Sequence, residues 1–449
     1  MTGELQKLIL EKTGLRLGIN KISELARLVY EIGRREKTGP ETLLDGPEIS
    51  AILKKTGSGY LAKFAGIKKY LIGKRYPNAS RVGGEIYFSR LKDRPRGARL
   101  YGEPFIPEHI FIEEAAAAYP IAERARGLYP GVKCQTIESL KSYAKSAPAS
   151  ALDPKKRDIF VALQKWDFVK PCPCTQNVVN CGYHIINLGF GCPFDCSYCY
   201  LQQYSNFPGI IIDANINDYL QKIKDYLNKY PVKRIRVGTG EFSDSLALDG
   251  ITGYAKELVE FFSDKKAVLE LKTKSANIEG FIGARHGGNT VVSWSLNPEK
   301  IVEAEELGAA SLTERLKAAK TCVSAGFGVG FHFDPVIFYN GWENDYEAVV
   351  NRLFDSVKDP AWISIGALRF HRALKDVIEQ RFPESDYIYG ELFLGADKKM
   401  RYYPELRRGI FDKMNGFIKA RNNKTLVYLC MEGPEMWREV LGRTKPGFN

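Results

Sequence analysis

The sequence contains no apolar run that approaches the roughly 18 residues needed to span a membrane. Its first residues, MTGELQKLILEKTG, carry charges among the apolar positions and have no small-residue cleavage site, so they do not resemble a secretory signal. It also has no fixed-period repeat and no low-complexity tract. These absences predict a cytoplasmic protein without a membrane partner.

Cysteine is scarce as well, with nine in 449 residues, most of them between Cys172 and Cys199. An odd number of cysteines in a long chain does not fit a disulfide framework, which is typical of short secreted proteins with even numbers. In a reducing compartment, such thiols are free to bind metal.

Strand and helix patterns alternate from about His184 onward. The apolar runs HIINLGFG, IRVGTG, AVLELKTK, TVVSWSL, VGFHFDPV and WISIGALRF are separated by amphipathic stretches such as YAKELVEFF and SLTERLKAAKTCVSAG. About six such repeats predict parallel strands joined by right-handed crossovers. The fold class is therefore α/β, a partial (β/α)6 TIM-like barrel, with chemistry expected at the carboxyl ends of its strands.

The chain exceeds the roughly 250–300 residues at which single cores stop growing, so more than one domain is expected. Apolar residues at helical spacing predict two amphipathic helices near the N-terminus. We predict a basic, mainly helical module at 1–105, a lead-in segment at 106–183 that packs on the barrel, the barrel at 184–375, and a C-terminal α/β extension at 376–449.

The basic charge of the chain is regional. The formal net charge is +12, and residues 51–100 alone hold 13 Lys and Arg against 2 Asp and Glu. A basic segment interleaved with Tyr60, Phe64, Tyr70 and Tyr76 suits DNA or RNA binding, with rings that stack on bases beside neutralised phosphates. An amphipathic helix that packs its rings inward, under a solvated basic surface, shows the same pattern.

Three cysteines follow the first barrel strand, at the spacing Cys192-x3-Cys196-x2-Cys199. A structural zinc ion normally takes four ligands, and Cys172, Cys174 and Cys181 are near enough in sequence to leave a zinc site open. A [4Fe–4S] cluster held by three cysteines instead leaves one iron open, and that iron can bind a cofactor.

The cysteine motif resembles the signature of the radical SAM superfamily, Cys-x3-Cys-x-aromatic-Cys, with Tyr198 at the aromatic position. The resemblance implies that Cys192, Cys196 and Cys199 bind a [4Fe–4S] cluster that chelates S-adenosylmethionine (SAM). It further implies reductive cleavage of SAM to a 5′-deoxyadenosyl radical, and an electron donor such as flavodoxin or ferredoxin.

Longer stretches, CSYCYLQQY, SWSLNPEKI and SLTERLKAAKTCVSAGFGVGF, resemble spore photoproduct lyase and its relatives from about Ile110 to about Ile418. This resemblance implies that Tyr198 and Tyr200 take part in a radical relay. It also implies that polar residues at or beyond the strand ends contact SAM, namely Ser243, Lys274, Ser295 and Asn297.

The chain departs from that family at Glu241, where the lyase has a cysteine that returns a hydrogen atom to the product radical. A carboxylate cannot donate a hydrogen atom as a thiol does, so we expect a relative of the lyase rather than the lyase itself. Gly240 and Glu241 resemble the Gly-Gly-Glu element of the superfamily, in which the glutamate accepts from the SAM ammonium group.

Other residues are candidates for the remaining chemistry. Cys174, beside Cys172 and Cys181, is a candidate catalytic thiol, or these cysteines bind a further metal. Cys430 and Cys322 are expected in the core. His332 and Asp334 alternate on one strand and so share a face, either as proton-transfer groups or as a satisfied interior pair.

The leading hypothesis is a radical SAM enzyme that acts on a nucleic acid or nucleotide, in DNA repair or modification. One alternative keeps the radical chemistry and assigns a small-molecule or peptide substrate. A second alternative is a zinc-stabilised nucleic-acid-binding protein without enzyme activity.

Overall fold

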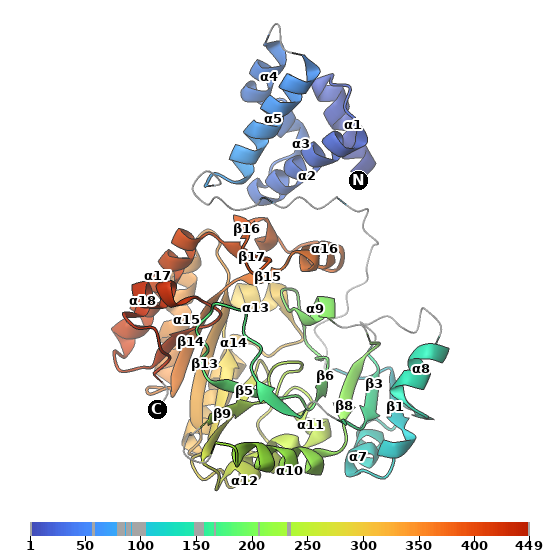
Figure 1. The fold of residues 1–449 in the computed structure, drawn as a ribbon, viewed down its shortest axis with the longest axis vertical. Coiled ribbons are helices and arrows are strands. Elements are labelled where there is room, and N and C mark those ends of the chain that lie inside the picture. The colour runs from blue at the N-terminus through green and yellow to red at the C-terminus, as the bar shows by residue number, and fades with distance from the viewer. Residues whose placement is uncertain are drawn as a thin grey trace. The chain divides into compact units, whose positions relative to one another are not determined.

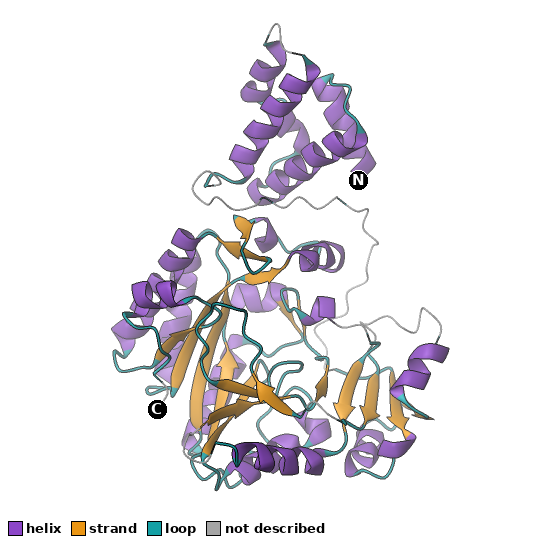
Figure 2. Ribbon diagram, viewed as in Figure 1, coloured by secondary structure: helices purple, strands orange, loops and turns teal. Residues whose placement is uncertain are grey.

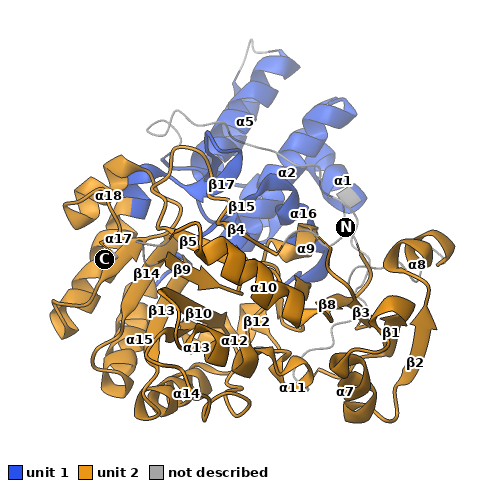
Figure 3. Ribbon diagram, turned by 60° about the horizontal axis from the view of Figure 1, so that its bottom comes forward, with its two compact units in different colours: residues 1–99, 337–340, 367–407 blue, residues 100–336, 341–366, 408–449 orange. Residues whose placement is uncertain are grey.

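The computed structural model describes residues 2–55, 59–78, 86, 91, 105–147, 157–165, 168–204, 207–230 and 235–447. The chain divides into two compact units, coloured separately in Figure 3. Unit 1 consists of residues 1–99, 337–340 and 367–407, and unit 2 of residues 100–336, 341–366 and 408–449. None of the helices described combines the length and apolar character needed to cross a membrane.

Unit 2 contains a curled eight-stranded sheet with the order β18-β14-β13-β11-β10-β9-β5-β4 (Figure 1). Its strands are β4 (Val169–Pro171), β5 (Tyr183–Ile186), β9 (Ile235–Gly238), β10 (Ala267–Thr273), β11 (Thr290–Ser295), β13 (Gly328–Val336), β14 (Trp362–Ala367) and β18 (Val427–Leu429). The ladders from β5 through β9, β10 and β11 to β13 are parallel, as is β14 with β18, whereas β4 is antiparallel to β5. The predicted α/β partial barrel is confirmed.

Helices lie along the outer side of this sheet (Figures 1 and 2). They are α10 (Ile216–Leu227), α12 (Tyr254–Phe262), α13 (Glu299–Glu305), α14 (Leu312–Ser324), α15 (Trp342–Ser356), α17 (Pro404–Arg421) and α18 (Pro434–Leu441). Two short helices, α9 (Leu201–Tyr204) and α11 (Asp249–Thr252), lie in loops that follow strands. Every residue of β11 and β14 is buried, as expected for parallel strands covered on both faces. A capping box of Ser311 and Glu314 starts α14.

The six predicted strands correspond to β5, β9, β10, β11, β13 and β14, and β18 adds a further parallel strand at one edge. Its three residues are too few for a periodic signal, and its position is fixed by backbone pairing with Ile363–Ile365. The predicted lead-in segment contributes to a second sheet of order β2-β1-β3-β8-β6. The strands from the segment are β1 (His109–Glu113), β2 (Lys133–Ile137) and β3 (Ile159–Ala162), and the later chain adds β6 (Gly189–Phe190) and β8 (Ile210–Asp213). The segment also contains η1 (Glu114–Ala116), α7 (Pro120–Leu128) and α8 (Leu140–Ser146). A two-stranded ladder joins β7 (Asp195–Cys196) to β12 (Glu306–Leu307).

Unit 1 combines the N-terminal helices with a later segment of the chain. The helices are α1 (Thr2–Thr13), α2 (Ile19–Glu36), α3 (Pro40–Leu44), α4 (Pro47–Lys54) and α5 (Tyr60–Arg75), and the later segment contributes β15 (Arg369–His371), α16 (Arg372–Arg381), η3 (Tyr387–Tyr389), β16 (Leu392–Leu394) and β17 (Lys399–Tyr402). The predicted helical N-terminal region, with its first two amphipathic helices, is confirmed. Phe64 and Tyr76 are buried whereas Tyr60 is exposed, so the inward-packing interpretation holds for most of the basic helix.

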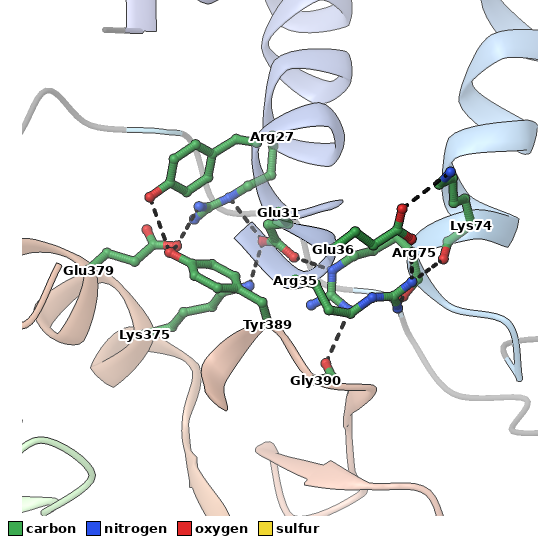
Figure 4. Close-up of polar contacts among 11 residues, drawn as sticks. Arg27, Glu31, Arg35, Glu36, Lys74, Arg75, Lys375, Glu379, Tyr389 and Gly390 are labelled. Carbon is green, nitrogen blue, oxygen red and sulfur yellow. Dashed lines mark hydrogen bonds and ion pairs between the residues drawn. The ribbon is translucent and has the colours of Figure 1, made fainter. Parts of the chain in front are cut away.

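A buried ion network joins the two parts of unit 1 (Figure 4). Glu31 of α2 accepts from Lys375 of α16 at 2.5 Å and from Arg75 of α5 at 2.7 Å. Arg27 donates to Glu379 at 2.6 Å. Residues 367–407 therefore pack with the N-terminal helices, and the predicted extension 376–449 is divided between the two units.

Candidate active site

The cysteine loop follows β5 and is held by short β-structure at both ends. β6 pairs with β8, and β7 pairs with β12 so that Cys196 lies opposite Glu306. Gly189 has a φ of +144°, and a Cβ atom there would lie 2.2 Å from the carbonyl oxygen of Ile211. Only glycine permits this close approach, which brings the loop against the second sheet.

The three cysteines of the loop lie close enough to affect one another's ionisation. Burial raises the pKa of the Cys192 thiol, and the charge of Cys199 raises it further. Burial also raises the pKa of Cys196, as do the charges of Cys199 and Cys192. The backbone N–H groups of Phe194 and Asp244 act in the opposite direction and lower the pKa of Cys192 in part. Three thiols on one loop, two of which (Cys192 and Cys196) resist ionisation without a cation, fit a site built to bind metal.

A buried carboxylate, Glu306, anchors the loop from β12. Tyr198 donates its hydroxyl proton to Glu306, and the side-chain amide of Asn297 donates to the same oxygen at 2.8 Å. Arg315 pairs with the other oxygen at 2.6 Å, and Tyr346 donates to Asn297 at 2.7 Å. Burial alone would raise the pKa of Glu306, but Arg315 and Lys274 outweigh it and hold that pKa below its usual value. Glu306 is therefore a fixed negative charge beside the cysteine loop.

Lys274, just beyond the carboxyl end of β10, is a second cation beside these groups. Its ammonium lies 5.8 Å from the centre of the Tyr198 ring. Burial disfavours the charged form, yet Glu306 and Cys196 raise the pKa of Lys274 above its usual value. Asp244 positions the backbone here, because its carboxylate accepts from the Lys274 N–H at 2.6 Å. The predicted SAM-contacting lysine is thus brought to the cysteine loop and remains charged.

The residues predicted on the loop after β9 lie next to Tyr200. Tyr200 donates its hydroxyl proton to the backbone carbonyl of Glu241. A Cβ atom on Gly240 would lie 2.9 Å from the Cβ of Lys272, so a side chain there would displace β10. Ser243 is half-buried and its hydroxyl contacts the carbonyl of Asp244. The structure therefore brings Glu241 and the cysteine-loop tyrosine together.

Ser295 and Asn297, at the end of β11, are both buried. The Ser295 carbonyl accepts from Arg315 at 2.9 Å. Both ends of the Asn297 side-chain amide are used within the Glu306 network. This placement puts Asn297 behind Tyr198 as a supporting residue.

His332 lies inside the barrel, in a network on the central strands. Its ring contacts Glu270 at 2.8 Å and Ser364 at 2.5 Å. Burial lowers the pKa of His332 to about 4, so the ring is neutral near pH 7 and donates a hydrogen bond to Glu270 rather than forming an ion pair. Arg236 lies 3.4 Å from the other Glu270 oxygen and holds the pKa of that buried carboxyl down at about 2. Asp334, on the same strand, is half-buried.

The remaining cysteines differ in how deeply they are buried. Cys322 is fully buried, which confirms the core interpretation. Cys430 is only half-buried and lies close enough to Cys172 to raise its pKa, so the expectation that it is a core residue is wrong. The reason is that the buried strand β18 is short and ends directly before Cys430, so Cys430 lies in the loop that follows. Cys174 lies beside Cys172, with their sulfur atoms 3.8 Å apart.

Sequence reasoning missed Glu306, Arg315, Asp244 and Tyr346. Glu306 stands in the run EAEELGAASLTERLK, where nothing in the local pattern separates it from the charged residues of a solvated helix surface. Its burial depends on the pairing of β12 with β7, which joins segments about 110 residues apart. No local signal in the sequence predicts such a pairing.

A curled parallel sheet, with three convergent thiols on the loop after its first parallel strand, defines the chain as a protein of the radical SAM class. A family model described as "Spore photoproduct lyase" matches residues 105–402. The chain therefore belongs to the spore photoproduct lyase family.

Two lyases illustrate the sequence relationship. Spore photoproduct lyase of a Geobacillus species is 25% identical over 322 residues, which cover 69% of this chain and 90% of that protein. The lyase of Bacillus subtilis is 24% identical over 321 residues, covering 68% and 89%.

Two solved structures show a similar fold. Spore photoproduct lyase complexed with dinucleoside spore photoproduct has a TM-score of 0.63 at 24% identity, covering 73% of this chain and all of that one. A mutant lyase with bound AdoMet and dinucleoside spore photoproduct has a TM-score of 0.63 at 24% identity and covers 74% of this chain.

Proposed function

We propose that this chain is a [4Fe–4S]-dependent radical SAM enzyme that acts on a nucleic acid or nucleotide. The observation that carries the proposal is the convergence of Cys192, Cys196 and Cys199 beside the charged Lys274, in a member of the spore photoproduct lyase family. The chemistry that a bound cluster and SAM supply is reductive cleavage to a 5′-deoxyadenosyl radical, which takes hydrogen from a substrate carbon.

In this proposal, the chain's own residues bind the cluster and orient SAM. The three thiols hold the cluster, and Lys274 neutralises the methionine carboxylate as a point charge. The Glu241 carboxylate accepts from the ammonium group, with the hydroxyls of Ser243 and Ser295 as further contacts. Asn297 acts indirectly, because it holds Glu306 in place.

The two tyrosines of the cysteine loop have different roles in this proposal. Tyr198 is buried and donates to the ionised Glu306, so its hydroxyl hydrogen is held in a structural bond. Tyr200 is 37% exposed and donates only to a neutral backbone carbonyl, that of Glu241. Tyr200 is therefore the better placed of the two to pass a hydrogen atom to a product radical. Cys174 stays a predicted alternative donor.

A nucleotide substrate is supported by a similar chain and by the basic module. A structure of similar fold holds a dinucleoside spore photoproduct. Much of the segment 51–100 lies outside the described residues, which here are 51–55, 59–78, 86 and 91. Within them, Lys54, Lys55 and Lys69 are exposed, and none of the three forms an ion pair with an acidic residue of the described part of the chain. Tyr60 is also exposed, as stacking on bases requires.

The radical chemistry is tested by anaerobic reconstitution with iron, sulfide and SAM. Wild-type protein should form 5′-deoxyadenosine, and Cys196→Ala should form none. Cys134→Ser, at an exposed cysteine on β2, is the matched control and should retain full activity. Deuterium from a labelled nucleotide substrate should appear in 5′-deoxyadenosine. Normal SAM cleavage by Cys196→Ala would disprove the assignment of the cluster site.

The proposed binding of nucleic acid is tested separately, by measuring how the affinity for DNA and RNA depends on salt. Lys54→Glu/Lys69→Glu should weaken binding and reduce the salt slope by about 1 for each phosphate that the protein no longer neutralises. Lys256→Glu/Lys320→Glu makes the same charge change at exposed lysines of unit 2 and should leave binding unchanged. SAM cleavage without any polynucleotide binding at low salt would favour a small-molecule or peptide substrate instead.

A further inference from the structure

The segment between β4 and β5 contacts the residues that follow β18. β4 forms one edge of that sheet and β18 the other. The Cys172 N–H donates to the carbonyl of Tyr183 at 2.9 Å, which fixes the segment to the start of β5. The Val179 N–H donates at 2.9 Å to the carbonyl of Glu432, two residues beyond Cys430. The residues that follow β18 are thereby brought to the residues that precede β5.

Four thiols gather at this contact. The sulfur atoms of Cys172 and Cys174 are 3.8 Å apart. Cys174, Cys430 and Cys181 each act electrostatically on the thiol of Cys172. Arg236 links the two distant segments, because it contacts the Cys181 sulfur at 3.2 Å and the hydroxyl of Tyr428, two residues before Cys430, at 3.2 Å. All four side chains are half-buried, which leaves a path for a metal to enter.

The close pair already has the geometry of two ligands on one metal ion. Two sulfur ligands at 2.3 Å from a tetrahedral metal lie about 3.8 Å apart, the separation observed between Cys172 and Cys174. No third Cys, His, Asp or Glu among the described residues places a ligand atom within 4.8 Å of both sulfur atoms. Neither Cys181 nor Cys430 therefore completes a compact three-thiol set with this pair, and a cluster of two metals accommodates thiols that stand further apart than the ligands of a single tetrahedral ion.

A buried cation balances the charge that four thiolates would bring. A terminal nitrogen of Arg236 lies 3.2 Å from the Cys181 sulfur, and Arg236 is buried. The guanidinium also lies 5.1 Å from the ring centre of Tyr183 and 5.2 Å from that of Tyr428, so its position is fixed by packing. A hydrogen bond from a fixed cation to a ligand sulfur is the kind of outer contact that supports iron–sulfur sites.

We propose that Cys172, Cys174, Cys181 and Cys430 bind a second metal centre, whose ligands lie outside the Cys192–Cys199 motif, and that this group is a [2Fe–2S] cluster. A tetrathiolate set selects iron–sulfur clusters or zinc, and the wide spacing of Cys181 and Cys430 favours the cluster. A metal-bound thiolate carries no transferable hydrogen atom. Metal at this site therefore excludes Cys174 as the hydrogen donor.

The test uses full-length protein purified without oxygen, with Cys192, Cys196 and Cys199 all replaced by alanine. This triple variant removes the site of the proposed function, so its metal content reports on the second site alone. We expect about two iron and two sulfide per chain, with visible absorption, as a [2Fe–2S] cluster requires. Adding Cys172→Ser and Cys174→Ser should remove the iron and the colour, whereas adding Cys134→Ser should not.

The metal content of these variants distinguishes a [2Fe–2S] cluster from a zinc site and from no site. About one zinc per chain, lost with Cys172→Ser/Cys174→Ser, would keep the four-thiol site and overturn its assignment to iron. A triple variant with neither metal would overturn the site. If the triple variant does not fold, wild type and Cys172→Ser/Cys174→Ser are compared directly, and equal iron, sulfide and zinc contents would overturn the proposal. A disulfide between Cys172 and Cys174 in metal-free wild type, detected by mass spectrometry, would overturn it as well.

Discussion

The ammonium group of Lys375 donates to the carboxylate of Glu31 across 2.5 Å, although the two residues lie 344 positions apart and both are buried (Figure 4). Arg75 donates to the other Glu31 oxygen at 2.7 Å, and Arg27 lies 3.4 Å away. Glu31 is therefore the shared anion of three buried cations from α2, α5 and α16. Removing it leaves those cations without their common counter-charge.

Glu31→Gln should accordingly destabilise unit 1 strongly. Truncating one partner of a buried ion network typically costs about 3–5 kcal/mol, because the remaining charges stay buried. Urea unfolding followed by circular dichroism measures this, since unit 1 contains no tryptophan. Glu11→Gln breaks the exposed pair with Lys7 and should cost less than about 1 kcal/mol. Equal effects of the two variants would contradict the structural role of Glu31.

The same network determines an acid-sensitive part of the stability. Burial would raise the pKa of Glu31, but Lys375 and Arg75 outweigh it and lower that pKa to about 2. The unfolded chain binds this proton near pH 4.5, so the stabilisation is complete above pH 4.5 and is lost as the pH falls towards 2. We expect wild type to lose roughly 3 kcal/mol more than Glu31→Gln across this window. Parallel stability curves for the two proteins would refute this.

Removal of residues 1–100 is a poor way to test the role of the basic module. The deletion would leave Lys375 and Glu379 of α16 without Glu31 and Arg27, which are their buried partners. We expect the truncated chain to be less soluble and to unfold at a lower temperature, which a thermal scan would show. Any loss of nucleic-acid binding would then follow from misfolding. Substitutions at exposed lysines avoid this confusion.

The barrel could be predicted because its strands and helices carry local signals. TVVSWSL and WISIGALRF are apolar runs of strand length, and the cysteine spacing is itself a motif. Interactions between distant segments could not be predicted in this way. Lys375 looks like an ordinary helix-surface lysine, and its burial is evident only when α16 packs on α2. Glu306 was missed and Cys430 was wrongly expected in the core for the same reason, because their surroundings are determined by strand pairing.

Lys274→Met should impair the site while leaving the barrel folded. Without the ammonium group, Cys196 loses the cation that lowers its pKa, and Glu306 loses one of its two cations. We expect at least about tenfold weaker SAM binding, because a charge-assisted contact contributes about 1.5–3 kcal/mol. Equilibrium dialysis of the reconstituted protein measures this. Lys266→Met, at the exposed amino end of the same strand, is the control and should bind SAM normally.

The two tyrosines of the cysteine loop should respond differently to the loss of the hydroxyl group. Tyr198→Phe leaves the buried Glu306 with one donor fewer, and we expect a destabilisation of about 1–3 kcal/mol. Tyr200→Phe removes a bond to a backbone carbonyl at a partly exposed position, so its melting temperature should stay near that of wild type. Its effect should instead appear in the products, as less hydrogen returned to the substrate for each SAM cleaved. Thermal unfolding and product analysis with labelled substrate separate the two effects. A Tyr200→Phe variant with unchanged product yield would remove Tyr200 from the relay.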